Sequence, residues 1–336
     1  MDFTITKVNP LDHAEEIKRL FVTNERSDFP SFFDRAYPSA VRSGGMSWVG
    51  RDSDGHAVMH VGVFPHRFRF GAREVLGGLM VNALVAQAYR SFFPARALMK
   101  RARQESQARG DIDFLYTDPN EQARAVLEVS GFVTLGEVKR YVLPVGDRHW
   151  LLDRAIRVLH AGARVANLTR PCMALVARRA TEFSPVGFDA PLGDSPALRP
   201  YHDRGRYVGR IPGYPTPLDW WFTAQRNGDA SAPVAGLLVR GPEPSGVATL
   251  YAVCREPRVA LASLVPPLIA ALRSRGCTRL DISTLAQSRF AAELRRAGFV
   301  PRSDNRPLLA APLTQIGEAV VRAAPLWEIT GLDCDR

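Results

Sequence analysis

The chain has 336 residues and a mass of 37.1 kDa, which is enough for about two domains of ordinary size. Hydrophobic residues make up 46% of the chain and charged residues 23%, and this apolar content excludes an intrinsically disordered protein. The net charge of +10 favours anionic partners, such as a phosphorylated cofactor, an acidic carrier protein, nucleic acid or an anionic lipid surface.

Several other classes of protein are also disfavoured. The longest largely apolar run, Val259–Leu272, is too short to cross a bilayer, and the N-terminus shows no secretory signal pattern. No basic run is interleaved with aromatic residues, so no DNA or RNA groove is expected. The four cysteines form no C-x-x-C pair and the histidines form no cluster with the spacing of metal ligands, so no bound metal is expected. Free thiols and a cytoplasmic location are the default expectation for such cysteines.

The first half of the sequence alternates strand and helix patterns. In chain order it predicts a strand at 3–8, helices at 13–24 and 31–42, strands at 46–51, 57–70 and 74–85, a helix at 94–109, a strand at 112–117, a helix at 121–130 and a strand at 132–144. Gly110 and Gly131 follow the last two helices as stop signals. This order predicts a layered α/β domain.

The middle of the chain separates two halves. Residues 150–170 have the pattern of an amphipathic helix, which favours a helix connecting two domains over one lying on an anionic membrane, although membrane contact stays open. Residues 185–217 are rich in proline and glycine and are predicted to be irregular.

The second half repeats part of the first. Arg109-Gly110 and Arg275-Gly276 lie 166 positions apart, and Gly131-Phe132 and Gly298-Phe299 lie 167 apart, with a short apolar strand and a helix between them in both halves. A constant offset predicts two copies of one fold. We expect domains at 1–145 and 181–336, joined by a helix and a strand at 146–180.

The segment from Leu79 to Leu98 carries the strongest chemical signal. A strand is predicted to end near Val85 and a helix to start near Pro94, with Arg90 at the mouth of the connection. The start of a helix presents free N–H groups and the positive end of the helix dipole. Directly after a strand, these groups favour binding of a pyrophosphate.

The first half of the chain resembles the GNAT (N-acetyltransferase) superfamily. The resemblance rests on the order of elements, on Tyr89-Arg90 before the helix, and on the later Asn120, Ala123 and Gly131-Phe132. The donor loop of that superfamily reads Gln/Arg-x-x-Gly-x-Gly/Ala, and Arg90-Ser91-Phe92-Phe93-Pro94-Ala95 stands in that place. The resemblance covers residues 1–145, and residues of about 180–315 look like a degenerate repeat. It implies an α/β fold of two tandem GNAT-like domains, each with a mixed twisted sheet flanked by helices. The pair of domains is similar to tandem GNAT-like proteins of bacterial polysaccharide or envelope biosynthesis.

The resemblance also implies a donor site. The donor is acyl-CoA or an acylated carrier protein, and its pantetheine arm pairs with an exposed strand edge at Leu84, Val85 and Ala86. Its pyrophosphate lies on the helix start, at Arg90, Ser91, Phe92, Phe93, Ala95 and Arg96. An acceptor amine or hydroxyl then attacks the thioester directly, and the enzyme contributes mainly positioning and proton removal.

Three positions depart from the family pattern. Phe93 replaces a glycine that allows close approach of the backbone to phosphate, and Pro94 lacks an N–H donor although it suits a first helical turn. Leu127 stands where many members carry a tyrosine that protonates the leaving thiolate. A thiolate is a fair leaving group near neutral pH, so the loss of that acid is tolerable.

The candidate catalytic residues are Asn82, Tyr116, Asp118 and Asn120, of which only Asp118 is a carboxylate. The sequence Asp118-Pro119-Asn120 also fits a turn and a helix cap, and His60 fits a structural role better than a place in the slot. Direct attack with water as the proton relay needs no dedicated base.

In the second half, the loop at 255–260 has no glycine, and Glu256 would repel phosphate, so this donor site is predicted to be lost. The sequence therefore predicts an acyltransferase with one donor site and a small-molecule, sugar or amino-acid acceptor. Two alternatives remain open. One is a Fem-type transferase that uses aminoacyl-tRNA, and the other is a non-catalytic GNAT-like binding or scaffold protein.

Overall fold

The computed structural model describes residues 3–146, 173–180, 197–200, 207, 211, 214–226, 233–256 and 258–331. The predicted helix at 150–170 and most of the stretch at 185–217 lie outside these residues. Contacts divide the chain into two compact units. Unit 1 consists of 1–138, 194–214 and 306–336, and unit 2 of 139–193 and 215–305.

Unit 1 contains most of the elements expected from the first half, each within two residues of its predicted bounds. They are β1 (Thr4–Val8), α1 (Ala14–Val22), α2 (Phe29–Arg42), β2 (Met46–Arg51), β3 (Ala57–Phe70), β4 (Arg73–Val85), α3 (Phe92–Arg109), β5 (Phe114–Thr117), α4 (Glu121–Val129) and the start of β6 (Val133–Pro144). A short 3-10 turn, η1 (Gln87–Tyr89), joins β4 to α3, and β8 (Leu198–Pro200), the end of β13 (Val300–Pro312), α9 (Gln315–Arg322) and η3 (Ala324–Leu326) complete the unit.

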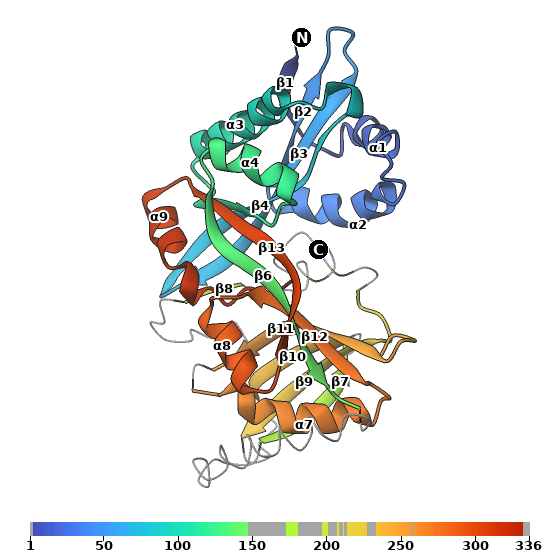
Figure 1. Cartoon of the computed structure of the whole chain (residues 1–336), viewed down its shortest axis with the longest axis vertical. Coiled ribbons are helices and arrows are strands. Elements are labelled where there is room, and N and C mark those ends of the chain that lie inside the picture. The colour runs from blue at the N-terminus through green and yellow to red at the C-terminus, as the bar shows by residue number, and fades with distance from the viewer. Residues whose placement is uncertain are drawn as a thin grey trace. The chain divides into compact units, whose positions relative to one another are not determined.

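The sheet of unit 1 has the strand order β1-β2-β3-β4-β5-β13, and β8 pairs with β3. The neighbouring strands are antiparallel except for β4 and β5, which are parallel. Helices α3 and α4 pack on one face through a core that includes Leu98, Val126 and Leu115. Helices α1 and α2 lie beside β3 (Figure 1). The ring of Phe21 on α1 contacts His60, and the ring of Tyr37 on α2 contacts Phe64.

Unit 2 repeats the order of elements found in unit 1. It contains β7 (Met173–Arg179), β9 (Asp219–Arg226), β10 (Pro233–Arg240), β11 (Val247–Arg255), α7 (Leu261–Arg273), β12 (Arg279–Leu285) and α8 (Arg289–Arg296). The succession β11-α7-β12-α8-β13 matches β4-α3-β5-α4-β6, and in both units the strands flanking the first helix are parallel. Gly110, Gly276, Gly131 and Gly298 all adopt positive φ after their helices, as the repeated stop signals predict.

The long strands β6 and β13 each run from one unit into the other. The second half of β6 contributes Tyr141 and Leu143 to the core of unit 2. The end of β13 pairs with β5, from Leu309 opposite Thr117 to Pro312 opposite Phe114, and contributes to the core of unit 1. The contact division therefore differs from the boundaries predicted at residues 145 and 181, because each half of the sequence donates its last strand segment to the other unit.

Within the described part of the chain, no helix has both the length and the apolar content needed to cross a bilayer. Cys254 and Cys277 are buried and free.

Candidate functional site

Strands β4 and β5 separate part of the way along their length. They pair only from Gly77 opposite Phe114 to Leu79 opposite Tyr116, and β5 ends at Thr117. Gly77 and Gly78 allow this close approach, because a Cβ at Gly77 would lie 2.6 Å from the Phe114 ring and one at Gly78 2.8 Å from the Leu115 side chain. Strand β4 continues to Val85, so its last residues leave β5 and open one edge of the strand.

A bulge accompanies this separation. The register of β3 and β4 passes from Gly62 opposite Val81 to His60 opposite Leu84, which leaves an extra residue on β4. Asn82 lies there with φ of +52°, a left-handed conformation that asparagine tolerates better than most residues. Bulges bend and twist a strand, so this one turns the end of β4.

The end of β4 presents backbone groups on the edge that faces away from β3. The N–H of Ala86 donates to the carbonyl of Val58 on β3 at 2.8 Å. Because successive residues of a strand point their backbone groups to opposite edges, the N–H and C=O of Val85 face the opened edge. The guanidinium of Arg90 contacts that carbonyl, with Nε at 3.3 Å from the Val85 oxygen.

His60 supports the bulge from inside the core. Its side chain is fully buried, and its Nδ1 donates to the carbonyl oxygen of Asn82 at 2.9 Å, since a carbonyl can only accept. Its Nε2 then accepts from the hydroxyl of Ser47 at 3.0 Å. Burial lowers the pKa of His60 to about 4, so the imidazole is neutral near pH 7. This arrangement fits the structural role expected for His60.

The start of α3 presents free amides at the mouth of the opened edge. Ser91 precedes the helix and makes no capping bond with its side chain. At the N-terminus, Ser91, Phe92 and Phe93 carry N–H groups that lack an intrahelical acceptor, Pro94 has no N–H, and the N–H of Ala95 faces the carbonyl of Ser91 as the first bond of the helix. Phe93 is 75% exposed, so its ring points to solvent and does not fill the loop. The bulky residue in place of glycine therefore leaves the helix start accessible.

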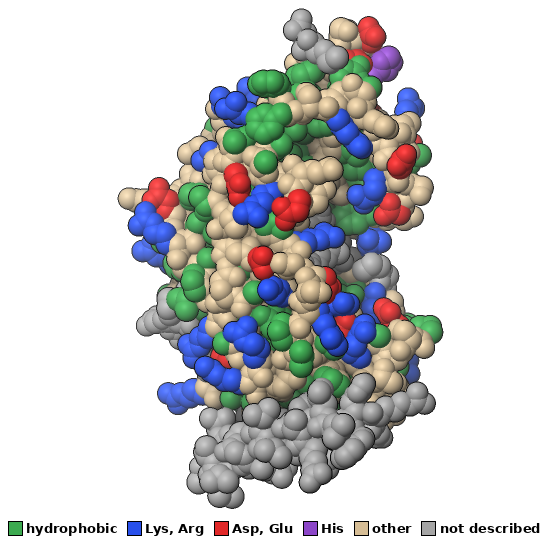
Figure 2. All heavy atoms as spheres, in the orientation of Figure 1, with side chains coloured by type: hydrophobic (Ala, Val, Ile, Leu, Met, Phe, Trp, Pro, Cys, Tyr) green, Lys and Arg blue, Asp and Glu red, His purple; other side chains and the backbone are tan. Residues whose placement is uncertain are grey.

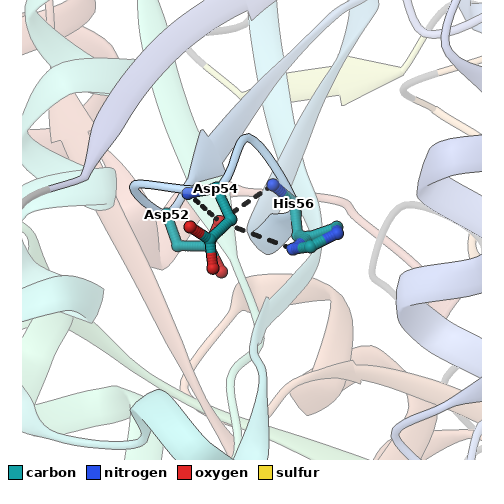
Figure 3. A group of neighbouring side chains, drawn as sticks. All are labelled: Asp52, Asp54 and His56. Atoms are coloured by element: carbon teal, nitrogen blue, oxygen red, sulfur yellow. Dashed lines mark hydrogen bonds and ion pairs between the residues drawn. The ribbon is translucent and has the colours of Figure 1, made fainter.

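Tyr89 ties this loop to the β2–β3 hairpin. Its hydroxyl donates to Asp52 Oδ2 at 2.8 Å, and Asp52 Oδ1 accepts from the amides of Asp54 at 3.1 Å and His56 at 2.9 Å (Figure 3). The hydrogen bond from Tyr89 is the main cause that lowers the pKa of Asp52, and the same bond raises the pKa of Tyr89. Sequence reasoning missed Asp52, because its partner lies 37 positions away.

Among the described residues, Asp52, Asp54 and His56 form the group of side chains that could meet around a metal ion, with ligand atoms within 4.8 Å of one another. Both carboxylate oxygens of Asp52 already accept hydrogen bonds, and Asp54 and His56 are exposed. These contacts are those of a hairpin turn, and we assign the group no metal.

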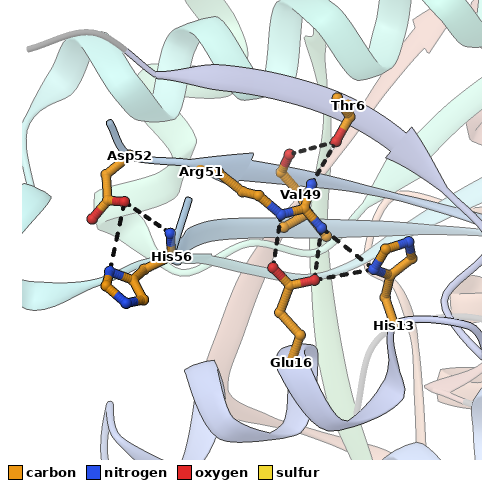
Figure 4. A network of polar contacts seen from close by, with 7 residues as sticks. All are labelled: Thr6, His13, Glu16, Val49, Arg51, Asp52 and His56. Atoms are coloured by element: carbon orange, nitrogen blue, oxygen red, sulfur yellow. Dashed lines mark hydrogen bonds and ion pairs between the residues drawn. The ribbon is translucent and has the colours of Figure 1, made fainter. Parts of the chain in front are cut away.

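A second polar network fixes α1 against the strands beside this hairpin. Arg51 donates to both oxygens of Glu16, at 2.8 and 2.6 Å, and to Thr6 at 2.8 Å, with His13 at 3.4 Å (Figure 4). Burial raises the pKa of Glu16, but the hydrogen bonds and charge of Arg51, aided by His13, outweigh it and lower the pKa. The network thus holds the strand that leads into the Asp52 turn.

Three of the four candidate catalytic residues make side-chain hydrogen bonds to different elements. Asn82 donates through Nδ2 to the Tyr37 hydroxyl on α2 at 3.2 Å. The buried Tyr116 hydroxyl lies 2.7 Å from His66 Nδ1 on β3. Asn120 caps α4, accepting from the amide of Ala123 at 2.9 Å, as its alternative interpretation predicts.

Asp118 follows β5 directly and is almost fully buried, at 3% exposure. Leu127, where many members of the family carry a tyrosine, packs into the core of unit 1. Asp118 is the carboxylate among the four candidates. It lies two residues after Tyr116, where the pairing of β5 with β4 ends.

The corresponding junction of unit 2 is filled by its own side chains. Arg255 at the end of β11 is 8% exposed, and its guanidinium donates to the carbonyl of Val259 at 2.6 Å and to Glu293 on α8 at 2.5 Å. Val259 and Leu261 are buried beside it. Arg255 thus serves its own loop, whereas Arg90 in unit 1 is exposed.

The solved structures that resemble this chain share one fold. A GCN5-related N-acetyltransferase from Anabaena variabilis matches with a TM-score of 0.64 and 12% identity, over 94% of this chain and 74% of that one. A tandem GNAT protein from the clavulanic acid biosynthesis pathway matches with a TM-score of 0.51 and 14% identity, over 93% and 99%. N-myristoyltransferase from Saccharomyces cerevisiae with bound myristoyl-CoA matches with a TM-score of 0.50 and 10% identity, over 92% and 82%.

No protein-family model and no curated protein matches the sequence. The similarity to the solved structures confirms the resemblance at the level of the fold: this chain has the GNAT fold, an α/β architecture with a mixed sheet flanked by helices. That fold is found in proteins that transfer acyl groups.

Proposed function

We propose that the chain is an acyltransferase that takes an acyl group from acyl-CoA and passes it to an amine or hydroxyl acceptor. The observation that carries this proposal is the separation of β4 from β5 after Leu79, directly beside the exposed start of α3. The opened edge of β4 offers backbone donors and acceptors, and the start of α3 beside it offers backbone donors. An extended amide-containing tail that ends in a diphosphate suits both.

The residues at this junction fit such a donor. Val85 offers a backbone N–H and C=O to the amides of a pantetheine arm, next to Leu84 and Ala86. The free amides of Phe92 and Phe93 face the diphosphate, Ala95 lies at the end of the same turn, and Arg90 and Arg96 add positive charge. Ser91 supplies a hydroxyl with no capping bond to make.

The transfer itself needs little from the protein beyond alignment. The acceptor forms a bond from nitrogen or oxygen to the thioester carbon, the carbon–sulfur bond breaks, and the thiolate of CoA leaves with the electron pair. The acceptor loses a proton, for which Asp118 is the proposed base, directly or through water. Asn82 and Tyr116 are proposed to position the groups around the opened edge, and Asn120 to fix the loop after Asp118 by capping α4.

We also propose that unit 2 is a repeat of unit 1 that does not bind a donor. Its junction holds the buried Arg255 and, next to it, Glu256, which would repel a phosphate. An acylated carrier protein is the alternative source of the thioester, because its pantetheine arm presents the same amides to the strand edge and its phosphodiester one anionic group to the helix start.

A thermal-shift series with acetyl-CoA and longer acyl-CoAs tests the proposal. Ligand at 100 times its dissociation constant adds roughly 2.7 kcal/mol to the free energy of unfolding, and Arg90→Ala should reduce this gain. A screen of amines and alcohols for release of the CoA thiol then identifies the acceptor, and Asp118→Asn should slow that release. No stabilisation by any thioester would favour a non-catalytic binding protein, and salt-sensitive binding of tRNA would favour an aminoacyl-tRNA-dependent transferase.

A further inference from the structure

The connection between β4 and α3 is held by contacts from other elements. Charge does not mark it, because Lys and Arg side chains are spread over the face of the molecule seen in Figure 2. Gln87, Ala88 and Arg90 are exposed, and the turn η1 has no side-chain cap of its own. The first N–H groups of a helical turn have no partner within that turn. The place of the connection therefore depends on hydrogen bonds such as the one from Tyr89 to Asp52.

A second hydrogen bond comes from the end of α1. The side-chain oxygen of Asn24 accepts from the N–H of Gln87 at 2.9 Å, across 63 positions of the sequence. The side-chain nitrogen of Asn24 donates to the carbonyl of Leu20 at 2.8 Å. Because an N–H must meet an oxygen and a carbonyl must meet a donor, these two contacts fix the orientation of the Asn24 amide. Its oxygen is therefore held toward the connection.

The backbone beside Asn24 is strained. The end of α1 carries two hydrogen bonds, from the N–H of Arg26 to the carbonyl of Phe21 at 3.0 Å and from the N–H of Glu25 to that of Val22 at 3.2 Å. This is the pattern of a Schellman cap, whose left-handed residue is usually glycine. Here that residue is Glu25, with φ of +68°, a conformation that costs free energy in a residue with a side chain. The cap turns the chain directly after Asn24 and so sets the place of its side chain.

The second strained position serves the same junction. Among the described residues, Glu25 and Asn82 are the two that have positive φ without being glycine. Asn82 lies at the bulge that turns the end of β4, and Glu25 follows the side chain that holds the connection after β4. Backbone strain persists where the surrounding structure imposes it, and it gathers at functional sites. Both observations point to a junction whose geometry is maintained at a cost.

We propose that Asn24 is a positioning residue for the donor site. It holds the connection in the place from which Val85 and Arg90 reach the donor, and it acts through the backbone of Gln87 without contact to the donor. This inference rests on the proposed function. Loss of the Asn24 oxygen should weaken the binding of acyl-CoA and leave the fold intact, because water can reach the exposed N–H of Gln87.

The test combines the affinity for acetyl-CoA, measured by calorimetry, with the hydrogen exchange of the Gln87 amide, measured by NMR. Asn24→Ala should weaken binding about 3- to 10-fold, as expected for one hydrogen bond, and should speed the exchange of this amide. Asn9→Ala is the matched control. The Asn9 side chain also accepts from one backbone N–H, that of Leu11 at 3.1 Å, but it lies before α1 and away from the connection, so neither quantity should change.

Two substitutions at the next residue test the strained cap, and both remove the same charge. Glu25→Gly suits the left-handed conformation, so it should keep the wild-type affinity without lowering the melting temperature. Glu25→Val disfavours that conformation, because a β-branched residue rarely adopts positive φ, and it should lose about as much affinity as Asn24→Ala.

Three results would overturn the inference. Wild-type affinity or unchanged Gln87 exchange in Asn24→Ala would remove the role of Asn24 and leave the proposed function standing. Equal affinities of the two Glu25 variants would show that the cap does not set the place of Asn24. Failure of the wild-type protein to bind acetyl-CoA or any longer acyl-CoA would overturn the proposed function, and this inference with it.

Discussion

The two strand-to-helix junctions, β4 to α3 and β11 to α7, follow the same path with opposite side-chain chemistry. Arg90 in unit 1 is exposed at the edge of the strand, whereas Arg255 in unit 2 is buried and bonded to Val259 and Glu293. Because Arg255 is buried, its guanidinium is out of reach of a ligand, whereas Arg90 bonds the carbonyl of Val85 through Nε and leaves the rest of its guanidinium exposed. Under the proposed function, the comparison teaches that the same backbone path can serve a donor in one unit and be closed by its own side chains in the other.

Removal of Glu293 should give the largest change in stability. Glu293→Ala leaves the guanidinium of Arg255 buried without its carboxylate, and breaking a buried pair from one side costs about 3–5 kcal/mol. Denaturant unfolding measures this loss, while the affinity for acyl-CoA should not change. Glu318→Ala removes an exposed pair with Arg322 and, as a control, should cost at most about 0.5 kcal/mol. An equally small loss for Glu293→Ala would show that Arg255 is not tied up in unit 2.

The bulge in β4 should make the stability of the protein depend on pH through His60. The pKa of His60 is about 4 in the folded chain and about 6.5 unfolded, so the unfolded state binds the proton more readily. The neutral imidazole of His60 contributes about 3 kcal/mol to the free energy of unfolding. This contribution is complete above pH 6.5 and is lost as the pH falls toward 4. Between pH 6.5 and pH 4, the free energy of unfolding of the wild-type protein should fall by about 3 kcal/mol more than that of His60→Gln. Parallel pH curves would contradict a buried neutral imidazole.

Introducing the acid of unit 2 into unit 1 should reduce binding of the donor. Ser91→Glu places a carboxylate where Glu256 stands after Arg255, and we expect the affinity for acyl-CoA to fall about 100-fold through like-charge repulsion. A carboxylate before a helix is otherwise favourable, so the melting temperature should not fall. Ser91→Gln is the neutral control. Undiminished binding by the glutamate variant would place the diphosphate away from this helix start.

Loss of the Tyr89 hydroxyl should have the smallest effect. Tyr89→Phe removes one hydrogen bond to the carboxylate of Asp52, and because this bond holds the loop in place, we expect the affinity for acyl-CoA to fall at most about tenfold. Asp52→Asn should weaken binding by a similar factor, and the double variant by no more than either alone. Additive losses would mean that the two side chains act separately.

Much of the first half could be predicted from local pattern. Strands β2 and β3 have their predicted bounds, and the repeated glycines adopt the left-handed conformation that a helix stop requires. Asn120 also caps a helix as its position suggested. These features depend on a few neighbouring residues, so the sequence contains what determines them.

Features that depend on distant residues could not be predicted. The exchange of segments of β6 and β13 depends on which strand each half finds as a partner, and neither strand's own pattern contains that choice. The bond from Tyr89 to Asp52 and the burial of Arg255 depend on side chains far along the chain. The exposure of the Phe93 ring likewise depends on its surroundings and could not be predicted from the loop sequence.

The central claim is that one junction of the two binds the donor, and the stoichiometry of acyl-CoA binding tests it most directly. Titration calorimetry with acetyl-CoA should give one site per chain in the wild-type protein and one site that binds about 100-fold more weakly in Ser91→Glu. Two sites per chain, or a single site that persists unchanged in Ser91→Glu, would contradict the account.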